Sequence, residues 1–81
     1  MKTSELVQLV CDEIDKASKD GAVKPVQLAK LVGVREQMIY RYISDRRIQS
    51  FETPGGYKRV KADVAKAWAT KYLTRKADRE S

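Results

Sequence analysis

The sequence contains no histidine and a single cysteine, Cys11, among its 81 residues. One cysteine excludes an intramolecular disulfide, and nothing in the chain indicates an oxidising compartment. Without histidine or paired cysteines the usual zinc-ligand spacings are absent, and a cysteine nucleophile would lack its base. No paired acidic cluster and no phosphate-binding glycine-rich loop is present either. We therefore expect neither an enzyme nor a metal or cofactor site.

Long apolar runs are missing as well. The stretch LVQLVC near the N-terminus is too short and too interrupted to cross a membrane, and no signal-peptide architecture surrounds it. With 42% hydrophobic and 35% charged residues, the composition is that of a globular chain. A chain of this length suffices for one small domain. We expect an intracellular protein with no membrane partner.

Positive charge is present in excess and is unevenly placed. The net charge is +6 and the isoelectric point is near 9.6, which favours an anionic partner. Residues 1–34 carry five lysines and five acids, which cancel. Residues 35–81 hold twelve bases against six acids, so the whole net charge belongs to this half.

The stretch from Pro25 to Asp45 predicts two short helices joined by a tight turn. Gly33 interrupts the pattern and can adopt the left-handed conformation that often ends a helix. Ala29 is small enough to allow close crossing of the two helices. The apolar residues at helical spacing are Leu28, Ala29 and Val32, followed by Val34, Met38, Ile39, Tyr42 and Ile43. This is the helix-turn-helix pattern, whose second helix enters a DNA major groove.

The opposite face of the second helix carries hydrogen-bonding side chains at positions i, i+3, i+4 and i+7. Arginine pairs with guanine and glutamine with adenine in the major groove, while tyrosine and serine reach phosphates or base edges. The start of the helix and the two arginines behind it are further candidates, for bases and for flanking phosphates respectively. The DNA-contact candidates of this segment are Arg35, Glu36, Gln37, Tyr40, Arg41, Ser44, Arg46 and Arg47. The alternative interpretation is a solvated face of an amphipathic helix.

An amphipathic helix is expected before this motif, capped by Thr3 or Ser4 and ended by Asp20-Gly21. Two short helices have little to bury against, so we expect this helix to pack across both of them and complete a three-helix core. Its apolar stripe is Leu6, Leu9, Val10, Ile14 and Ala17. Cys11 is expected to be a buried, inert thiol. The alternative is dimerisation through Val7 and Cys11. Residues 22–25 are expected to form a connection.

A two-stranded hairpin is predicted after the motif. Its first strand would run from Ile48 to Thr53 and its second from Tyr57 to Val60, around a Pro54-Gly55-Gly56 turn. An isolated hairpin is marginal in water, so we expect Ile48, Phe51 and Val60 to pack on the helices. Glycine N–H groups and cations at the tip would suit a DNA backbone or minor groove. The candidate residues are Thr53, Gly55, Gly56, Tyr57, Lys58 and Arg59.

The last predicted helix spans residues 61–74, and a charged tail, 75–81, is expected to be disordered. Trp68 is expected to anchor the inner side of this helix, together with Val64, Ala65, Ala69 and Tyr72. The predicted fold is thus mainly α with a small β-hairpin: a winged helix-turn-helix with a three-helix core, a two-stranded wing and a C-terminal helix. Residues 1–74 would form its single domain.

The run from Val26 to Trp68, about half of the chain, resembles the winged-helix module of MerR-type regulators and phage excisionases. The match rests on the helix-turn-helix, the Gly-Gly hairpin and the Asp-Val-x-x-x-Trp segment. By this resemblance, Tyr40 and Arg41 correspond to the family's Tyr-Arg pair in the recognition helix, and Gly56, Tyr57 and Arg59 to its wing. Two positions depart from the family: Arg35 replaces a capping Ser or Thr, and Arg46 stands near a usual Gly.

These observations predict a sequence-specific double-stranded DNA-binding protein of the cytoplasm, associated with the nucleoid. Its role would be that of a small transcription regulator or a recombination directionality factor, bound cooperatively with further copies of itself on DNA. A recombinase is a further expected partner. One alternative is a packaging or partition factor resembling a terminase small subunit, with an ATPase partner. Another is a winged-helix adaptor that binds proteins, whose binding would depend little on salt.

Overall fold

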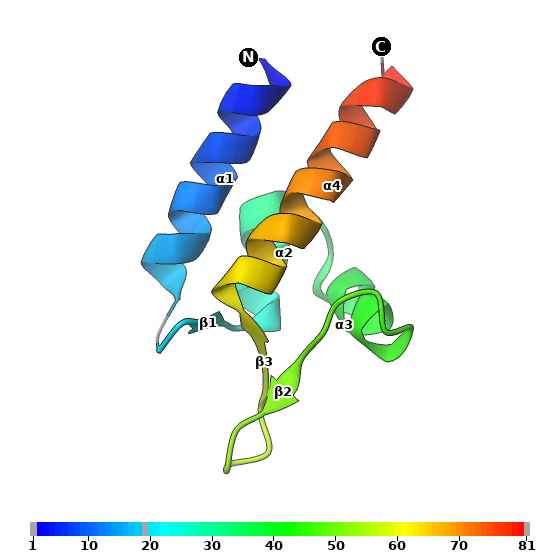
Figure 1. Ribbon diagram of the computed structural model, residues 1–81. Helices are drawn as coiled ribbons and strands as arrows, with labels where there is room; N and C mark the ends of the chain where they lie inside the picture. Colours follow the sequence, from blue (N-terminus) through cyan, green and yellow to red (C-terminus); the bar gives the residue numbers. More distant parts are fainter. Residues whose placement is uncertain (1, 19, 81) are drawn as a thin grey trace.

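A computed structural model of the protein describes residues 2–18 and 20–80, with side chains as far as Lys76. Figure 1 shows a small, mainly α-helical fold, and the described residues form four helices and a three-stranded antiparallel sheet. In chain order the elements are α1 (Thr3–Ala17), β1 (Ala22–Val23), α2 (Pro25–Val32), α3 (Glu36–Ser44), β2 (Phe51–Glu52), β3 (Lys58–Lys61) and α4 (Ala62–Glu80).

The first helix begins at Thr3, whereas a helix capped by Thr3 would begin one residue later. Lys2 is the N-cap, and no side-chain hydrogen bond caps the first turn. The backbone N–H groups of Glu5 and Leu6 both donate to the Lys2 carbonyl, at 3.1 Å each. The prediction that Thr3 or Ser4 caps this helix is therefore wrong, because both residues already lie inside its first turn.

Two features follow the last turn of α1: hydrogen bonds from Ser18 and two residues with positive φ angles. The Ser18 N–H and hydroxyl both donate to the carbonyl of Ile14, at 2.9 and 2.6 Å. Asp20 and Gly21 follow with positive φ angles of 54° and 78°, a conformation that suits glycine and is tolerated by aspartate. The helix thus ends at Ala17, just before the predicted stop.

The first helix packs chiefly along α4 and, to a lesser extent, against α2. Figure 1 shows α1 and α4 side by side and antiparallel. The prediction that α1 crosses both α2 and α3 is wrong in this respect, because its main contact is with α4. Of the predicted apolar stripe, Val10 and Ile14 lie in the core, whereas Leu6 and Leu9 are exposed. The Lys66 ammonium lies 2.9 Å from a carboxylate oxygen of Asp15, joining the two helices. This hydrogen bond and the attraction of the Asp15 charge raise the pKa of Lys66 above its ordinary value.

The connection expected between the first two helices is a strand. In β1, Ala22 pairs with Lys61 and Val23 pairs with Val60, antiparallel to β3. The sequence pattern does not reveal this strand, because two residues are too few to show an alternation. Both side chains are buried. The sheet therefore has the order β1-β3-β2, and the predicted two-stranded hairpin is one part of it.

The hairpin itself is shorter than predicted. Phe51 pairs with Arg59, and Glu52 pairs with Lys58. Strand β2 contains only Phe51 and Glu52. Ile48 precedes the strand and is buried, as expected, whereas the prediction that Phe51 packs on the core is wrong, since it is 41% exposed. The hairpin is instead held at its base through the central strand β3.

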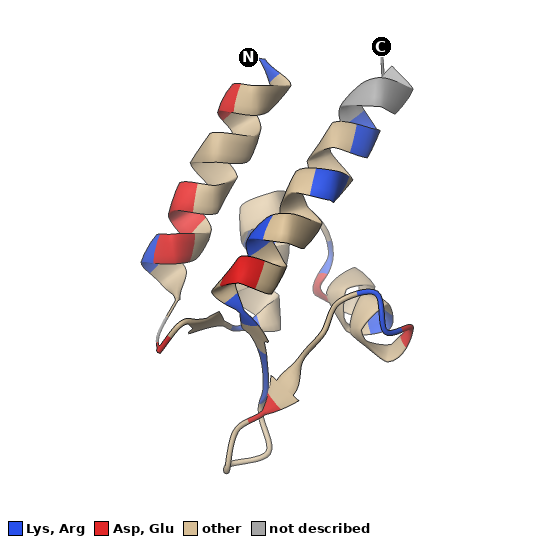
Figure 2. Ribbon diagram, viewed as in Figure 1, with Lys and Arg blue, Asp and Glu red and all other residues tan. Residues whose placement is uncertain are grey.

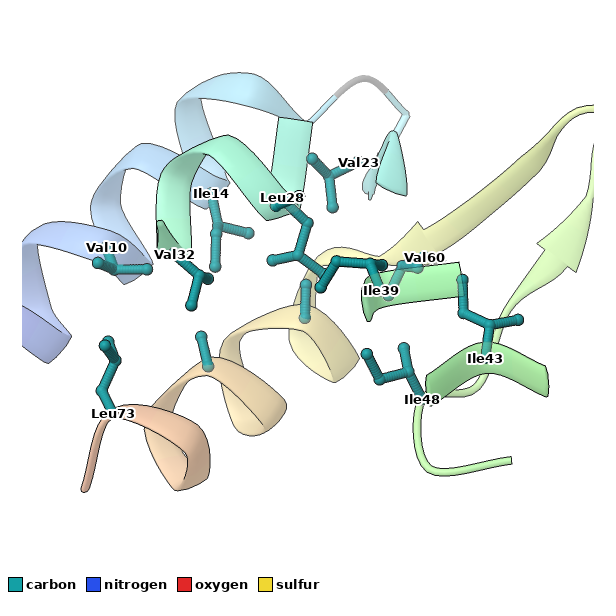
Figure 3. Close-up of a cluster of buried hydrophobic side chains, with 13 residues drawn as sticks. Val10, Ile14, Val23, Leu28, Val32, Ile39, Ile43, Ile48, Val60 and Leu73 are labelled. Carbon is teal, nitrogen blue, oxygen red and sulfur yellow. The ribbon is translucent and has the colours of Figure 1, made fainter. Parts of the chain in front are cut away.

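One apolar core joins all four helices to the sheet, as Figure 3 shows. Ile14, Leu28, Ile39, Ile48 and Val60 are fully enclosed side chains of this core. Ala29 is also buried, as close crossing of α2 and α3 requires. The thiol of Cys11 lies outside the core, half-buried and 3.9 Å from the Thr70 hydroxyl, so the expected buried thiol is a wrong prediction.

The last helix is longer than the predicted 61–74. It runs to Glu80, so the helix continues into the tail that was expected to be disordered, and Ser81 lies outside the described residues. Ala65 and Ala69 face the core, and Leu73 extends this buried stripe by one turn. None of the described helices has an apolar stretch long enough to cross a membrane. No cluster of metal-ligating side chains occurs among the described residues.

We expect Ile39→Ala to lower the free energy of unfolding by about 2–5 kcal/mol, because it leaves a cavity at the centre of the core. Ile39 has no exposed surface. Gln37→Ala, on the exposed side of the same helix, is the control and should change this free energy by less than about 0.5 kcal/mol. Urea denaturation of the two variants checks this. Equal stability of both would contradict the packing of α3 described above.

Candidate nucleic-acid interface

The turn between α2 and α3 is set by one glycine. Gly33 adopts a left-handed conformation with φ 86° and ψ 32°, as its position predicted. Both its N–H and that of Val34 donate to the carbonyl of Ala29, at 2.9 Å each, which closes the end of α2. Arg35 is then the N-cap of α3 but makes no capping hydrogen bond with its side chain. The guanidinium group is therefore not engaged in holding the helix start.

The third helix separates its side chains into two faces. Ile39 and Ile43 are buried in the core. The predicted polar residues lie on the opposite face, and all are exposed: Gln37, Tyr40, Arg41 and Ser44. Tyr40 is 39% exposed, so part of its side chain packs on the protein and part meets solvent. The residues of this face have the types and the spacing needed to read a major groove.

The end of α3 places an arginine in a conformation that favours glycine. The Arg46 N–H donates to the carbonyl of Ile43 at 3.1 Å, and the Arg47 N–H donates to that of Tyr42 at 2.9 Å. These bonds form a Schellman motif, in which Arg46 is the left-handed residue with φ 60°. Arg46 thus adopts a backbone conformation that favours glycine.

The tip of the β2–β3 hairpin is a compact turn. The Gly56 N–H donates to the Thr53 carbonyl, and the Thr53 N–H donates to the Tyr57 carbonyl, both at 2.8 Å. The Tyr57 N–H also donates to the Thr53 hydroxyl at 3.3 Å. Gly56 has a φ of 81°, and a Cβ on Gly55 would lie 3.1 Å from the Tyr57 ring. Thr53 and the two glycines therefore shape the tip, which is a structural role for three predicted DNA-contact residues.

The hairpin side chains that can bind an anion lie at the start of β3. The guanidinium of Arg59 lies over the Tyr57 ring, 5.7 Å from its centroid, and donates a 2.9 Å hydrogen bond to the Lys58 carbonyl. Tyr57 is 65% exposed, and Lys58 is exposed beside it. This contact holds Arg59 in one orientation, so less conformational entropy is lost when it binds a phosphate.

The hairpin and the third helix border the same groove. Tyr40 of α3 and Tyr57, Lys58 and Arg59 of the hairpin line it, together with residues at the start of α2. One of these is Lys24, an exposed cation that the sequence analysis missed. Its position becomes apparent only once β1 pairs with β3, because this pairing brings the residue after β1 beside the hairpin. We call this surface the hairpin groove.

A second hollow lies on the other flank of α3. Arg35, Gln37 and Arg41 line it, and Tyr72 of α4 forms its far side. The exposed face of α3 therefore lies between two grooves, with Tyr40 at one and Arg41 at the other. Glu36, at the start of the helix, is exposed as well. The structure thus brings most of the predicted base-contact residues onto one surface.

Two predicted contact residues point away from this surface and from each other. Arg46 lines a hollow beside β2, with Ile48 and Lys61. Arg47 instead lies over the Tyr42 ring, 5.8 Å from its centroid, on the side that faces α4. The adjacency of the two arginines in the sequence concealed this divergence, which follows from the left-handed backbone of Arg46.

Charge is distributed unevenly over the fold, as the sequence indicates. In Figure 2, acidic segments are frequent on α1, whereas basic segments follow the end of α3, strand β3 and the later turns of α4. The two ion pairs among the described residues, Lys16–Glu13 and Lys66–Asp15, involve neither α3 nor the hairpin. The cations of the candidate interface are therefore available to an anionic partner.

Comparison of the chain with protein-family models, with curated proteins and with solved structures found no match. The interface is accordingly defined by its own residues. It consists of the exposed face of α3, the hairpin groove and the hairpin tip. Its combination of a solvent-facing polar helix with flanking cations suits a grooved polyanion.

We expect Arg46→Gly to raise the melting temperature by several degrees, because it removes a left-handed strain of about 1 kcal/mol in a domain of this size. Arg46→Ala is the matched control, since it removes the same charge and side chain but keeps the Cβ. It should bring no comparable gain. Thermal unfolding followed by circular dichroism distinguishes the two, and an equal rise in both would attribute the effect to charge.

Proposed function

We propose that this protein is a sequence-specific double-stranded DNA-binding protein that uses a winged helix-turn-helix. The observation that carries the proposal is the hairpin groove, which Tyr40 of α3 shares with Lys58 and Arg59. A helix that reads bases and a hairpin that holds the backbone must act on one duplex at the same time. Residues of both elements line one surface here, which supports such a joint contact.

The third helix has the dimensions that this role needs. A helix with its side chains is about 10–12 Å wide, which matches the roughly 12 Å major groove of B-DNA. Arg41 is suited to a bidentate contact with guanine and Gln37 to one with adenine, and both are exposed on α3. Their neighbours Tyr40 and Ser44 reach base edges or phosphates from the same face.

The hairpin supplies the contacts that do not depend on sequence. Lys58 and Arg59 would neutralise phosphates beside the groove that α3 occupies, or Arg59 would enter the adjacent minor groove. Lys24, at the start of α2, adds a third cation to the same surface. In biological terms this supports the role of a small transcription regulator or recombination directionality factor, as the resemblance to MerR-type and excisionase modules implies.

The experiment that tests this function measures binding to the DNA that flanks the protein's own gene against a random duplex of equal length, over a salt series. We expect the protein to bind the flanking DNA more tightly than the random duplex. The logarithm of its association constant should fall linearly with the logarithm of the salt concentration, with a slope of about −0.9 for each phosphate neutralised. Equal binding to both duplexes would remove the base-reading role. Binding to neither would refute the proposal for these sites.

We expect Arg41→Ala and Lys58→Ala to separate base reading from backbone binding. Loss of a bidentate base contact at Arg41 should cost about 1–3 kcal/mol on the specific site and little on random DNA. Loss of the Lys58 phosphate contact should weaken both duplexes alike and reduce the salt slope by about 1. Fluorescence anisotropy titrations of both variants check this, and equal losses on both duplexes for both variants would contradict base reading by Arg41.

A further inference from the structure

An aromatic groove lies between α3 and α4, outside the interface described above. Tyr42 of α3 lies 5.6 Å from Trp68 of α4, measured between ring centroids, and the rings are inclined at 56°. Trp68 in turn stacks on Tyr72, with centroids 5.3 Å apart and planes inclined at 20°. All three rings line one hollow and are half-buried, so the cluster meets solvent along the groove.

The rim of the aromatic groove is basic. Arg47, Lys71, Arg75 and Lys76 line it, and no acidic side chain does so among the described residues. Arg47 is held over the Tyr42 ring, 5.8 Å from its centroid. An apolar, aromatic floor with a cationic rim is the composition of a protein-binding surface, in which tyrosine, tryptophan and arginine contribute much of the affinity.

The outward side of α1 has the complementary composition. Leu6 and Leu9 are 39% and 51% exposed, although leucine is a residue that usually contributes to a core. Glu5, Asp12 and Glu13 lie four, three and four positions from Leu9 and therefore surround it on the helix surface. The helix as a whole has four acids against one lysine. We call these five residues the acidic α1 face.

We propose that the aromatic groove binds the acidic α1 face of a second copy of this protein. Leu9 of one copy would lie in the groove of the next copy, against the outer side of the stacked Trp68 and Tyr72 rings. Glu5 and Asp12 would then face the cations of the rim, and Glu13 would exchange its exposed ion pair with Lys16 for one of these cations. The exposed leucines match the aromatic floor of the groove, and the acids match its basic rim.

The three rings favour a protein occupant over DNA at this place. A duplex backbone presents phosphates and sugars, so it would use the four cations of the rim but not a stacked aromatic floor. A leucine side chain, by contrast, buries apolar area against such rings. The acidic α1 face supplies both kinds of complementarity, since its acids match the rim and its leucines match the rings.

The two surfaces lie on different sides of α4, because α1 flanks this helix on one side and the contact with α3 lies on the other (Figure 1). The interface is therefore head-to-tail, and each copy leaves one surface free for a further copy. Leu6 and Leu9 are therefore the apolar residues of α1 that would contact the next copy. The alternative surface predicted from the sequence is less available, since Val7 packs against the core and Cys11 lies next to Thr70 of α4.

The test uses two variants of the full chain, each lacking one surface. Leu9→Ser/Asp12→Asn/Glu13→Gln removes the more exposed leucine and two of the three acids of the acidic α1 face, and Lys71→Gln/Arg75→Gln removes two rim cations. All five side chains are exposed, and circular dichroism checks that both variants fold. Lys30→Gln/Lys61→Gln is the matched control, because it removes the same charge from exposed positions outside the groove. Analytical ultracentrifugation at low salt, over a concentration series without DNA, gives the average mass.

We expect the average mass of the wild type and of the control to rise with concentration, and that of each variant to stay at the monomer value. An equimolar mixture of the two variants should form a complex of one copy each that does not grow further. Only a head-to-tail interface gives this rescue, because each variant retains the surface that the other lacks. High salt should dissociate the complex, since part of the attraction is ionic.

A wild type that remains monomeric over the whole series overturns the proposal, as does a mixture that shows no complex. A monomeric wild type whose Lys71→Gln/Arg75→Gln variant also binds less tightly to a duplex long enough for only one copy would, in addition, identify what the rim binds. The rim cations would then serve DNA. Because association is measured without DNA, its failure leaves the proposed DNA-binding function standing, and the reverse also holds.

Discussion

The burial of Ile39 and Ile43 determines the rotation of α3 about its axis, and the rest of the candidate interface depends on this rotation. Successive helical residues are about 100° apart, so enclosing these two side chains turns Gln37, Arg41 and Ser44 outward. A rotation by one residue in the direction of Tyr40 would expose Ile39 and Ile43 and would bury the hydroxyl groups of Tyr40 and Ser44 without partners, which costs several kcal/mol. The core thereby orients the residues proposed to read DNA, although it touches no ligand itself.

Strand pairing provides the second constraint. A free hairpin is marginal in water, and β2 contains only two residues, so the hairpin depends on β3 being held from its other side by β1. The Ala62 N–H adds a 2.8 Å hydrogen bond to the Gly21 carbonyl at the end of this pairing. One consequence is mechanical, because the hairpin is joined to the core at its base. The other is chemical, because Lys24 is brought beside Lys58 and Arg59.

The two proposals use neighbouring sides of α3. Its outward face carries Gln37 and Arg41, while Tyr42 turns toward α4 and contributes to the aromatic groove. A copy bound in this groove would therefore lie next to the surface proposed to meet DNA. Head-to-tail association would then repeat that surface along a duplex, which is a physical basis for the cooperative binding expected of a module with one small reading surface.

Much of the architecture was determined by the sequence alone, because its causes are local. The apolar spacing of α2 and α3, the left-handed turn at Gly33 and the glycines of the hairpin each act within a few residues, and the structure confirms these elements. The exposed polar face of α3 follows from the same spacing.

Only the tertiary structure decided what depends on partners distant in the chain. Strand β1 exists because β3 pairs with it, α1 packs along α4, and Arg47 leaves the surface of Arg41 for an aromatic ring. Contacts between residues far apart in sequence leave no periodic trace in either segment, so only the folded chain reveals them.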